Sequence, residues 1–168
     1  MKLELVPVTQ AEAFAIVAKI HRHLDPPRGW VCGVGLAVGG SRRLVGAGIL
    51  CRPVSPKTAK DKGVAEISRT AVPAGLRNGN SKIYGALRDA ARALGYWKVQ
   101  TFTLASESGA SLRAVGFKLE RPAAEDRSRQ PGAWGLSRPG RTPSLFGEPE
   151  IQVEPKNRWE CLLREEPA

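Results

Sequence analysis

The sequence predicts a mixed α/β (α+β) domain in which helices flank a central β-sheet. Two apolar runs joined by Gly39-Gly40-Ser41 are typical of a β-hairpin. The segment that follows Thr9 has the i, i+3, i+4, i+7 apolar spacing of an amphipathic helix. Farther along, a strand, a Gly/Asn-rich turn, a helix and a second strand follow one another. The 168 residues suit one domain with its own hydrophobic core, which we expect to cover residues 1–168.

The first elements are a strand and a helix. Residues 3–6 favour a short strand that ends at Pro7. Thr9 is a candidate N-cap, and Glu12 stands three residues later, which is the spacing of a capping box. The apolar pattern then runs to Leu24, and Asp25-Pro26-Pro27 ends the helix.

The hairpin and the third strand come next. We expect the two strands of the hairpin over residues 30–38 and 44–51. A polar loop over 53–63 and the third strand over 64–72 follow. Strict alternation along the third strand would place Glu66 and Ser68 on one face and Ile67 and Arg69 on the other.

The second half contains two helices and two further strands. After a turn over residues 73–81, Asn80 or Ser81 would cap a helix that ends before Gly95. A strand over 98–105 and a short helix over 106–115 follow, and Gly116-Phe117 closes that helix. Residues 121–156 are rich in Pro, Gly, Ser and Arg and predict long loops, with one strand near 133–136. A last strand over 157–163 would place Trp159, Cys161 and Leu163 on one side.

The charge balance indicates an anionic partner. The 26 Lys and Arg residues against 16 Asp and Glu give a net charge of +10. Such a surface suits nucleic acid, membrane headgroups or a phosphorylated small molecule, although it also serves solubility alone. Cys32, Cys51 and Cys161 form no CxxC motif, so we expect no metal site. Cys32 and Cys51 lie inside apolar strand-like runs, and we expect both to be buried thiols. Without a signal segment or a membrane-length apolar run, we expect a cytoplasmic protein with no membrane partner.

The turn at residues 77–82 has the composition of an anion cradle. Free N–H groups and the positive end of the macrodipole at a helix start favour phosphate, and Arg77 and Lys82 add full charges. The turn matches neither the Walker A motif nor the dinucleotide fingerprint. A capped loop that faces solvent fits the local sequence equally well.

The order of elements resembles the GNAT acyltransferase superfamily. The resemblance covers about residues 1–120 and the last strand. It rests on the strand at 64–72, the turn Arg77-Asn78-Gly79-Asn80-Ser81, the helix to residue 96, and the segment ending in Gly116-Phe117. It implies a mostly antiparallel sheet of about six to seven strands, splayed between 64–72 and 98–105. It also implies acetyl-CoA or another acyl-CoA as cofactor, with the pyrophosphate on the 77–82 turn. Members of the superfamily often form homodimers.

A narrower resemblance points to phage- and prophage-encoded GNAT-like proteins, related in kind to the Mom DNA-modification protein. It rests on HRH (21–23), RPV (52–54), EISR (66–69), LRNGNSKIYGA (76–86), TFTLASESGASLRAVGF (101–117) and EPKNRWE (154–160). It implies DNA as the substrate and a host cytoplasmic location.

Two positions depart from the family pattern. The usual loop reads Gln/Arg-x-x-Gly-x-Gly/Ala, and here Asn78 and Asn80 stand at the expected glycine positions. Asparagine tolerates the left-handed backbone better than most residues. Many members carry a tyrosine, as the acid for the leaving thiolate, where this chain has Leu112.

Transfer of an acyl group to an amine needs a base, a carbonyl-polarising donor and an acid. Glu66 is the first candidate base, and a salt bridge is its structural alternative. His21 and His23 cannot share a helix face, so at most one, His23 in our assignment, points into a site. Tyr84 could supply the acid or be a core tyrosine. The candidate cofactor-binding residues are Ser68, Arg69, Thr70, Arg77, Asn78, Gly79, Asn80, Ser81, Lys82, Ser106 and Ser111.

The basic C-terminal part suits a nucleic-acid acceptor, because arginines neutralise phosphates and tryptophans stack on bases. The candidate residues are His21, Arg52, Arg127, Arg129, Trp134, Arg138, Arg141, Arg158 and Trp159. A core tryptophan and a solvated loop are the alternative. Three functions are therefore open: an N-acyltransferase acting on nucleic acid, one acting on a small amine or a protein amino group, and a non-catalytic nucleic-acid-binding protein.

Overall fold

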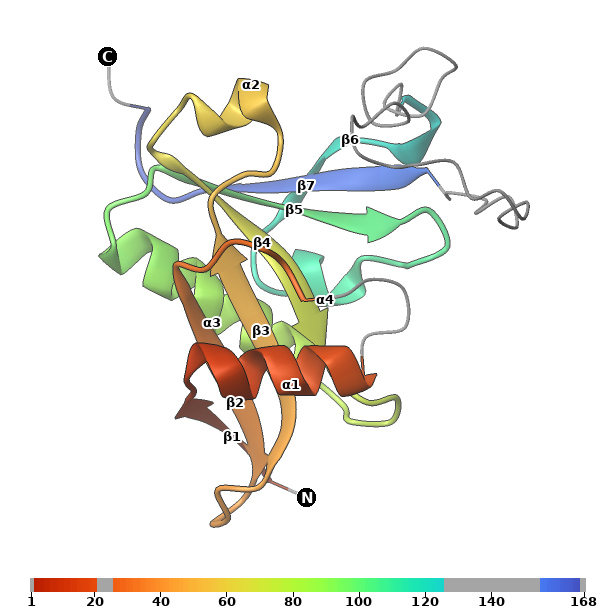
Figure 1. Cartoon of the computed structure of the whole chain (residues 1–168). Helices are drawn as coiled ribbons and strands as arrows, with labels where there is room; N and C mark the ends of the chain where they lie inside the picture. The colour runs from red at the N-terminus through yellow and green to blue at the C-terminus, as the bar shows by residue number, and fades with distance from the viewer. Residues whose placement is uncertain (1, 21–25, 126–154, 167–168) are drawn as a thin grey trace, which may run out of the picture.

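A computed structural model describes residues 2–20, 26–125 and 155–166. Seven strands form one mixed sheet in the order β1-β2-β3-β4-β5-β7-β6. Helix α1 lies on one face of the sheet, and α3 lies on the other (Figure 1). The elements are β1 (Leu3–Pro7), α1 (Gln10–Ile20), β2 (Cys32–Val38), β3 (Leu44–Cys51), α2 (Pro56–Ala59), β4 (Val64–Ala71), α3 (Gly79–Ala93), β5 (Lys98–Leu104), α4 (Ala110–Arg113), β6 (Lys118–Arg121), a 3-10 turn (Ala123–Glu125) and β7 (Lys156–Leu162).

The predicted fold class is confirmed. Every neighbouring pair of strands is antiparallel except β4 and β5, which are parallel. No helix within the described ranges is long and apolar enough to cross a membrane.

The capping box at the start of α1 forms as predicted. The backbone N–H and the hydroxyl of Thr9 both bond Glu12 Oε2 at 2.8 Å, and the Glu12 N–H donates to Thr9 Oγ1 at 3.3 Å. Behind this cap, Ala13 and Val17 are fully buried against the sheet. The cap therefore fixes where the amphipathic face of α1 begins.

Replacing Thr9 with alanine removes the side-chain half of this capping box. We expect the free energy of unfolding to fall by about 1 kcal/mol, which is typical for the loss of a Ser or Thr N-cap. Urea denaturation of the variant measures the change. Thr9→Ser is the matched control, because serine keeps the hydroxyl and should retain most of the stability.

Two layers of apolar side chains cover the two faces of the sheet. On the α1 face, Ala47, Ile49 and Cys51 of β3 pack with α1. On the α3 face, Ile83 and Leu87 of α3 pack in a larger cluster with residues of β2–β5 and β7. Because β3 alternates between the two layers, all residues from Gly46 to Cys51 are buried.

Strands β4 and β5 pair only over their first halves. Their register runs from Val64 opposite Lys98 to Ile67 opposite Thr101, although both strands continue for at least three more residues. Thr101 Oγ1 donates to the Ile67 carbonyl at 2.8 Å at the last pair. The predicted splay between the two strands is therefore present.

A bulge in β4 breaks the predicted alternation. The pairing of β3 with β4 shifts between Ile49 and Leu50, so that Ser68 has no partner in the register. Ser68 still faces the α1 side, where its Oγ lies 3.1 Å from Cys51 Sγ. Thr70, however, bonds Tyr84 on the α3 side. The prediction of strict alternation through Arg69 was wrong because the extra residue changes the phase of the strand.

Other boundaries also differ from the predictions. Helix α3 begins at Gly79 with Asn78 as its N-cap, two residues before the earlier of the expected caps. Helix α4 begins only at Ala110, and the expected loop over 53–63 contains the short helix α2. Strand β6 had not been predicted. The expected strand near 133–136 and most of the 121–156 insertion lie outside the described residues.

Candidate functional site

A cleft of about 300 Å³ opens where β4 and β5 separate. It reaches both faces of the sheet, because Ile20 of α1 and Tyr84 of α3 both line it. Its lining residues are Ile20, Thr70, Ala71, Val72, Asn80, Tyr84, Thr103, Glu107, Ser108, Gly109, Ala110, Ser111 and Leu112. The predicted residues Thr70, Asn80, Tyr84 and Ser111 therefore meet in one place.

The phenol of Tyr84 lies inside this cleft. Thr70 Oγ1 donates to Tyr84 Oη at 3.1 Å, and the Tyr84 ring packs 6.2 Å from the ring of Phe117. Burial raises the pKa of Tyr84 above its ordinary value, and the negative charge of Glu107 adds to the rise. Tyr84 therefore keeps its proton at neutral pH, as a proton donor must.

The start of α3 presents unused backbone donors beside the cleft. Asn78 has φ +60°, a left-handed conformation that asparagine tolerates better than most side chains. The Lys82 N–H bonds the Asn78 carbonyl at 3.0 Å, and the Gly79 N–H bonds the Leu76 carbonyl at 3.1 Å. The N–H groups of Asn78, Asn80 and Ser81 donate no hydrogen bond within the described chain. Three free donors at a helix start can hold an anion.

Gly79 is the glycine that the packing of this turn requires. A Cβ at this position would lie 2.8 Å from Val72 Cγ1 and 3.1 Å from Leu36 Cδ2. Gly79 is therefore the position of this turn at which a side chain would not fit unless its neighbours moved. Arg77 and Lys82 flank the turn as exposed cations.

The opposite wall of the cleft is built on a tryptophan. Trp159 of β7 is 2 % exposed, and its Nε1 donates to Thr103 Oγ1 at 3.0 Å. Gly109, with φ +65°, packs directly on the Trp159 ring and is the N-cap of α4. The expectation that Trp159 stacks on a nucleic-acid base is therefore wrong, because the ring is already buried by the protein.

The carboxylate of Glu66 is buried on the α1 face, one residue before β4 and β5 separate. Gln100 Nε2 donates to Glu66 Oε2 at 2.9 Å. Burial raises the pKa of Glu66, while the Gln100 hydrogen bond opposes the rise. A carboxylate with a raised pKa is a stronger base than an exposed one, which suits proton abstraction near neutral pH.

The remaining predicted residues are dispersed. Ser68 faces Cys51 rather than the cleft, Arg69 Nη1 donates to the Ser68 carbonyl, and Ser106 is exposed beyond β5. Arg52 is exposed after the end of β3, and Arg158 pairs with Glu160. The predicted residues outside the described part of the chain are His21, His23, Arg127, Arg129, Trp134, Arg138 and Arg141.

The residues of the site that had not been predicted include Gln100, Thr103, Glu107 and Gly109. Gln100 carries a readable signal, because it is a polar residue inside a strand whose neighbours are β-branched or aromatic. Its partner Glu66 lies 34 positions earlier in the chain, and only the parallel pairing of β4 with β5 joins them.

No protein-family model matches the sequence, and no curated protein sequence matches it. Solved structures do match over nearly the whole chain. The ribosomal-protein-S18-alanine N-acetyltransferase from Escherichia coli has 13% identity and a TM-score of 0.58, covering 99% of this chain and 97% of that one. An acetyltransferase from Bacillus subtilis in complex with CoA has 16% identity and a TM-score of 0.57, covering 96% and 97%.

A third solved structure, an N-acetyltransferase from Staphylococcus aureus Mu50, has 14% identity and a TM-score of 0.60, and the match covers 98% of this chain and all of that one. These identities are low, and the agreement lies in the path of the backbone. The chain therefore has the fold of the GNAT N-acetyltransferases.

Proposed function

We propose that the chain is an acyl-CoA-dependent N-acyltransferase that transfers the acyl group directly to an amine. The observation that carries the proposal is the cleft at the β4–β5 splay. It places free backbone donors at the start of α3 beside a protonated phenol, and the buried carboxylate of Glu66 lies on β4 four residues before Thr70, which lines the cleft.

The residues around the cleft fit an acyl-CoA. The donors of Asn78, Asn80 and Ser81, together with Arg77 and Lys82, suit a pyrophosphate. The cleft beyond them is lined by small side chains from Ser108 to Ser111, which leave room for an extended chain. When bound, an acyl-CoA supplies a thioester carbonyl that an amine can attack.

The protein side of the reaction is divided between the two faces of the sheet. Glu66 would accept the proton that the attacking amine loses, and Gln100 would hold the carboxylate in place. Tyr84 would hold a proton at Oη inside the cleft for the leaving sulfur. It would thus replace the tyrosine that many family members carry where this chain has Leu112. After Ile67, β4 pairs with β3 but no longer with β5, so backbone N–H groups on its β5 side could polarise a carbonyl.

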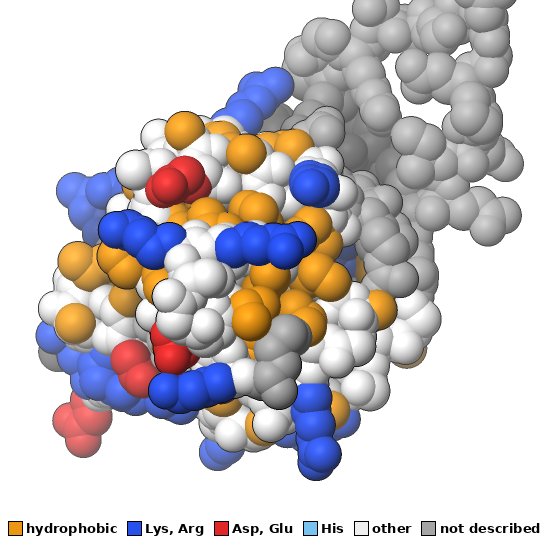
Figure 2. Space-filling model, turned by 90° about the horizontal axis from the view of Figure 1, so that it is seen from below, with side chains coloured by type: hydrophobic (Ala, Val, Ile, Leu, Met, Phe, Trp, Pro, Cys, Tyr) orange, Lys and Arg blue, Asp and Glu red, His pale blue; other side chains and the backbone are white. Residues whose placement is uncertain are grey.

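We propose that the acceptor is nucleic acid. The narrower resemblance favours DNA. The net charge of +10 supports an anionic partner. The surface seen from below also carries more Lys and Arg than Asp and Glu side chains, around a hydrophobic centre (Figure 2). An acceptor base in a duplex would have to leave the base stack to reach the cleft.

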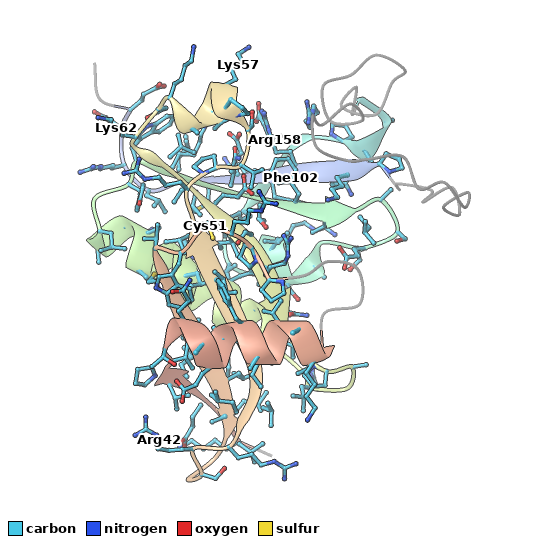
Figure 3. The ribbon with its side chains drawn as sticks, viewed as in Figure 1. Arg42, Cys51, Lys57, Lys62, Phe102 and Arg158 are labelled. Carbon is cyan, nitrogen blue, oxygen red and sulfur yellow. The ribbon has the colours of Figure 1, made fainter. Side chains whose placement is uncertain are left out.

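Titration calorimetry with acetyl-CoA tests the donor site. We expect saturable binding, weakened about threefold to fivefold in Arg77→Ala, because an exposed cation beside a phosphate contributes up to about 1 kcal/mol. Arg42→Ala is the matched control, since Arg42 is an equally exposed arginine at the tip of the β2–β3 hairpin, far from the cleft (Figure 3). Absence of acetyl-CoA binding by the unmodified protein would contradict the proposed function.

A further inference from the structure

Helix α1 covers only part of the sheet face on which it lies. Helix α1 packs on β2, β3 and β4, and its described residues make no comparable contact with β5, β7 or β6. On the uncovered part, Phe102 of β5 pairs in register with Arg158 of β7. Figure 3 shows Arg158 and Phe102 close together on the side of the sheet above α1. We call this surface the β5–β7 face.

The β5–β7 face carries more positive than negative charge. Glu160 Oε2 lies 3.4 Å from Lys98 Nζ, and its Oε1 lies 3.2 Å from Arg158 Nε. One carboxylate is therefore shared by two cations. Arg121 lies opposite Arg158 in the register of β6 with β7. Lys156 precedes Arg158 by two residues, so the two side chains lie on the same side of β7. Among the described residues, this face therefore carries four cations, Lys98, Arg121, Lys156 and Arg158, beside the carboxylates of Glu160 and Glu66, and this charge balance suits an anionic group.

The same face leads to the candidate base. Glu66, Gln100 and Glu160 lie side by side across β4, β5 and β7, because each pair is in register. The charge of Lys156 also acts on Glu66. Neighbouring strands are about 4.8 Å apart, and Arg158 lies two residues, or about 6.6 Å, along β7 from Glu160, so the backbone of Arg158 is about 12 Å from that of Glu66.

This separation selects among anionic amines. In a simple amino acid the amine and the carboxylate are adjacent, so one molecule could not reach both Arg158 and Glu66. In a nucleotide the base amine and the phosphate lie at opposite ends, with the sugar between them. The half-buried ring of Phe102 lies between the two positions and offers an apolar surface for the base or the sugar.

We propose that the β5–β7 face binds the phosphate of a nucleotide acceptor at Arg158 and Lys156, with Phe102 against the nucleoside and the base amine directed toward Glu66. This inference rests on the proposed function and locates its acceptor. The phosphate can belong to a free nucleotide or to a single strand of nucleic acid, and the experiment separates these two sources.

The test measures fluorescence anisotropy of a labelled mixed-sequence oligonucleotide of about twelve nucleotides. We expect Arg158→Gln to weaken binding about tenfold and to reduce the dependence of log K on log salt by about 0.7, the value for one phosphate contact on a single strand. Arg158→Lys should keep most of the affinity, which separates a charge effect from a folding defect. Arg42→Gln, which removes the same charge at the far hairpin, should change the affinity less than twofold.

Competition by unlabelled AMP and by an unlabelled oligonucleotide identifies the source of the phosphate. Displacement by AMP supports a free nucleotide, and displacement by the oligonucleotide alone supports a nucleic-acid strand. Equal effects of Arg158→Gln and Arg42→Gln would overturn the proposal, because binding would then follow net charge only. Acetyl-CoA calorimetry on the same variants keeps the two proposals separate: intact acetyl-CoA binding with no oligonucleotide binding contradicts only the acceptor site.

Discussion

Replacing Glu66 with glutamine is expected to slow acyl transfer about 10²- to 10⁴-fold, the range for loss of a general base, while acetyl-CoA binding persists. Glutamine has nearly the same shape and can still accept the hydrogen bond of Gln100, so the change removes the proton acceptor and little else. The rate is measured as CoA released, followed by chromatography, with a single-stranded oligonucleotide as acceptor. Glu120→Gln is the matched control, because Glu120 is an exposed carboxylate on β6.

The pH dependence gives a second readout of the same substitution. Burial raises the pKa of Glu66 above 4.5, so the unmodified protein is expected to lose its proposed activity as the pH falls through this raised value. The acidic limb of the pH–rate profile should therefore lie above pH 4.5 and disappear in Glu66→Gln. A limb that persists unchanged in the variant would assign the base to another residue.

Thermal stability should move in the opposite direction from activity. A carboxyl whose pKa is raised by folding binds protons more tightly in the folded state, so its ionisation costs stability as the pH rises through the folded-state pKa. Above that pH the cost is fully present. Glu66→Gln removes it and should raise the melting temperature at pH 7. A gain in stability with a loss of turnover is typical of a residue retained for function.

Local patterns in the sequence predicted most of the fold. The capping box of Thr9 and Glu12 and the Gly95 helix end depend on contacts within a few residues, and both form as expected. The Gly95 N–H bonds the Arg92 carbonyl and the Tyr96 N–H bonds the Ala91 carbonyl, which is the Schellman arrangement. Such signals can be read from one segment because they need no distant partner.

The failed expectations depend on contacts between distant segments. The bulge at Ser68 appears only when β4 is aligned on β3, and it changes which side Thr70 faces. Trp159 looked like a base-stacking residue until β7 placed it against Gly109 and Thr103. The Glu66–Gln100 pair required the parallel register of β4 with β5. In each case the missing information was strand pairing, which residue spacing along one chain does not encode.

The contact of Gly109 with Trp159 leads to the second large effect, expected for Gly109→Ala. A Cβ at this position would lie 2.2 Å from Trp159 Cζ2, and the φ of +65° disfavours alanine. The left-handed backbone costs about 1–2 kcal/mol and overpacking costs about 1–3 kcal/mol. The free energy of unfolding should therefore fall by about 2–5 kcal/mol. Because residues 109–112 line the cleft, acetyl-CoA should also bind more weakly.

Gly40→Ala isolates the part of this cost that comes from Trp159. Gly40 has a similar φ of +73°, but a Cβ there would meet nothing within 4 Å. Gly40→Ala should therefore lower the free energy of unfolding only by the backbone cost of about 1–2 kcal/mol and leave acetyl-CoA binding unchanged. Urea denaturation measures both variants, and calorimetry measures the binding. If the two substitutions cost the same, the tryptophan does not support the wall of the cleft. A larger cost at Gly109 with weaker acetyl-CoA binding would link the buried ring of β7 to the shape of the donor site.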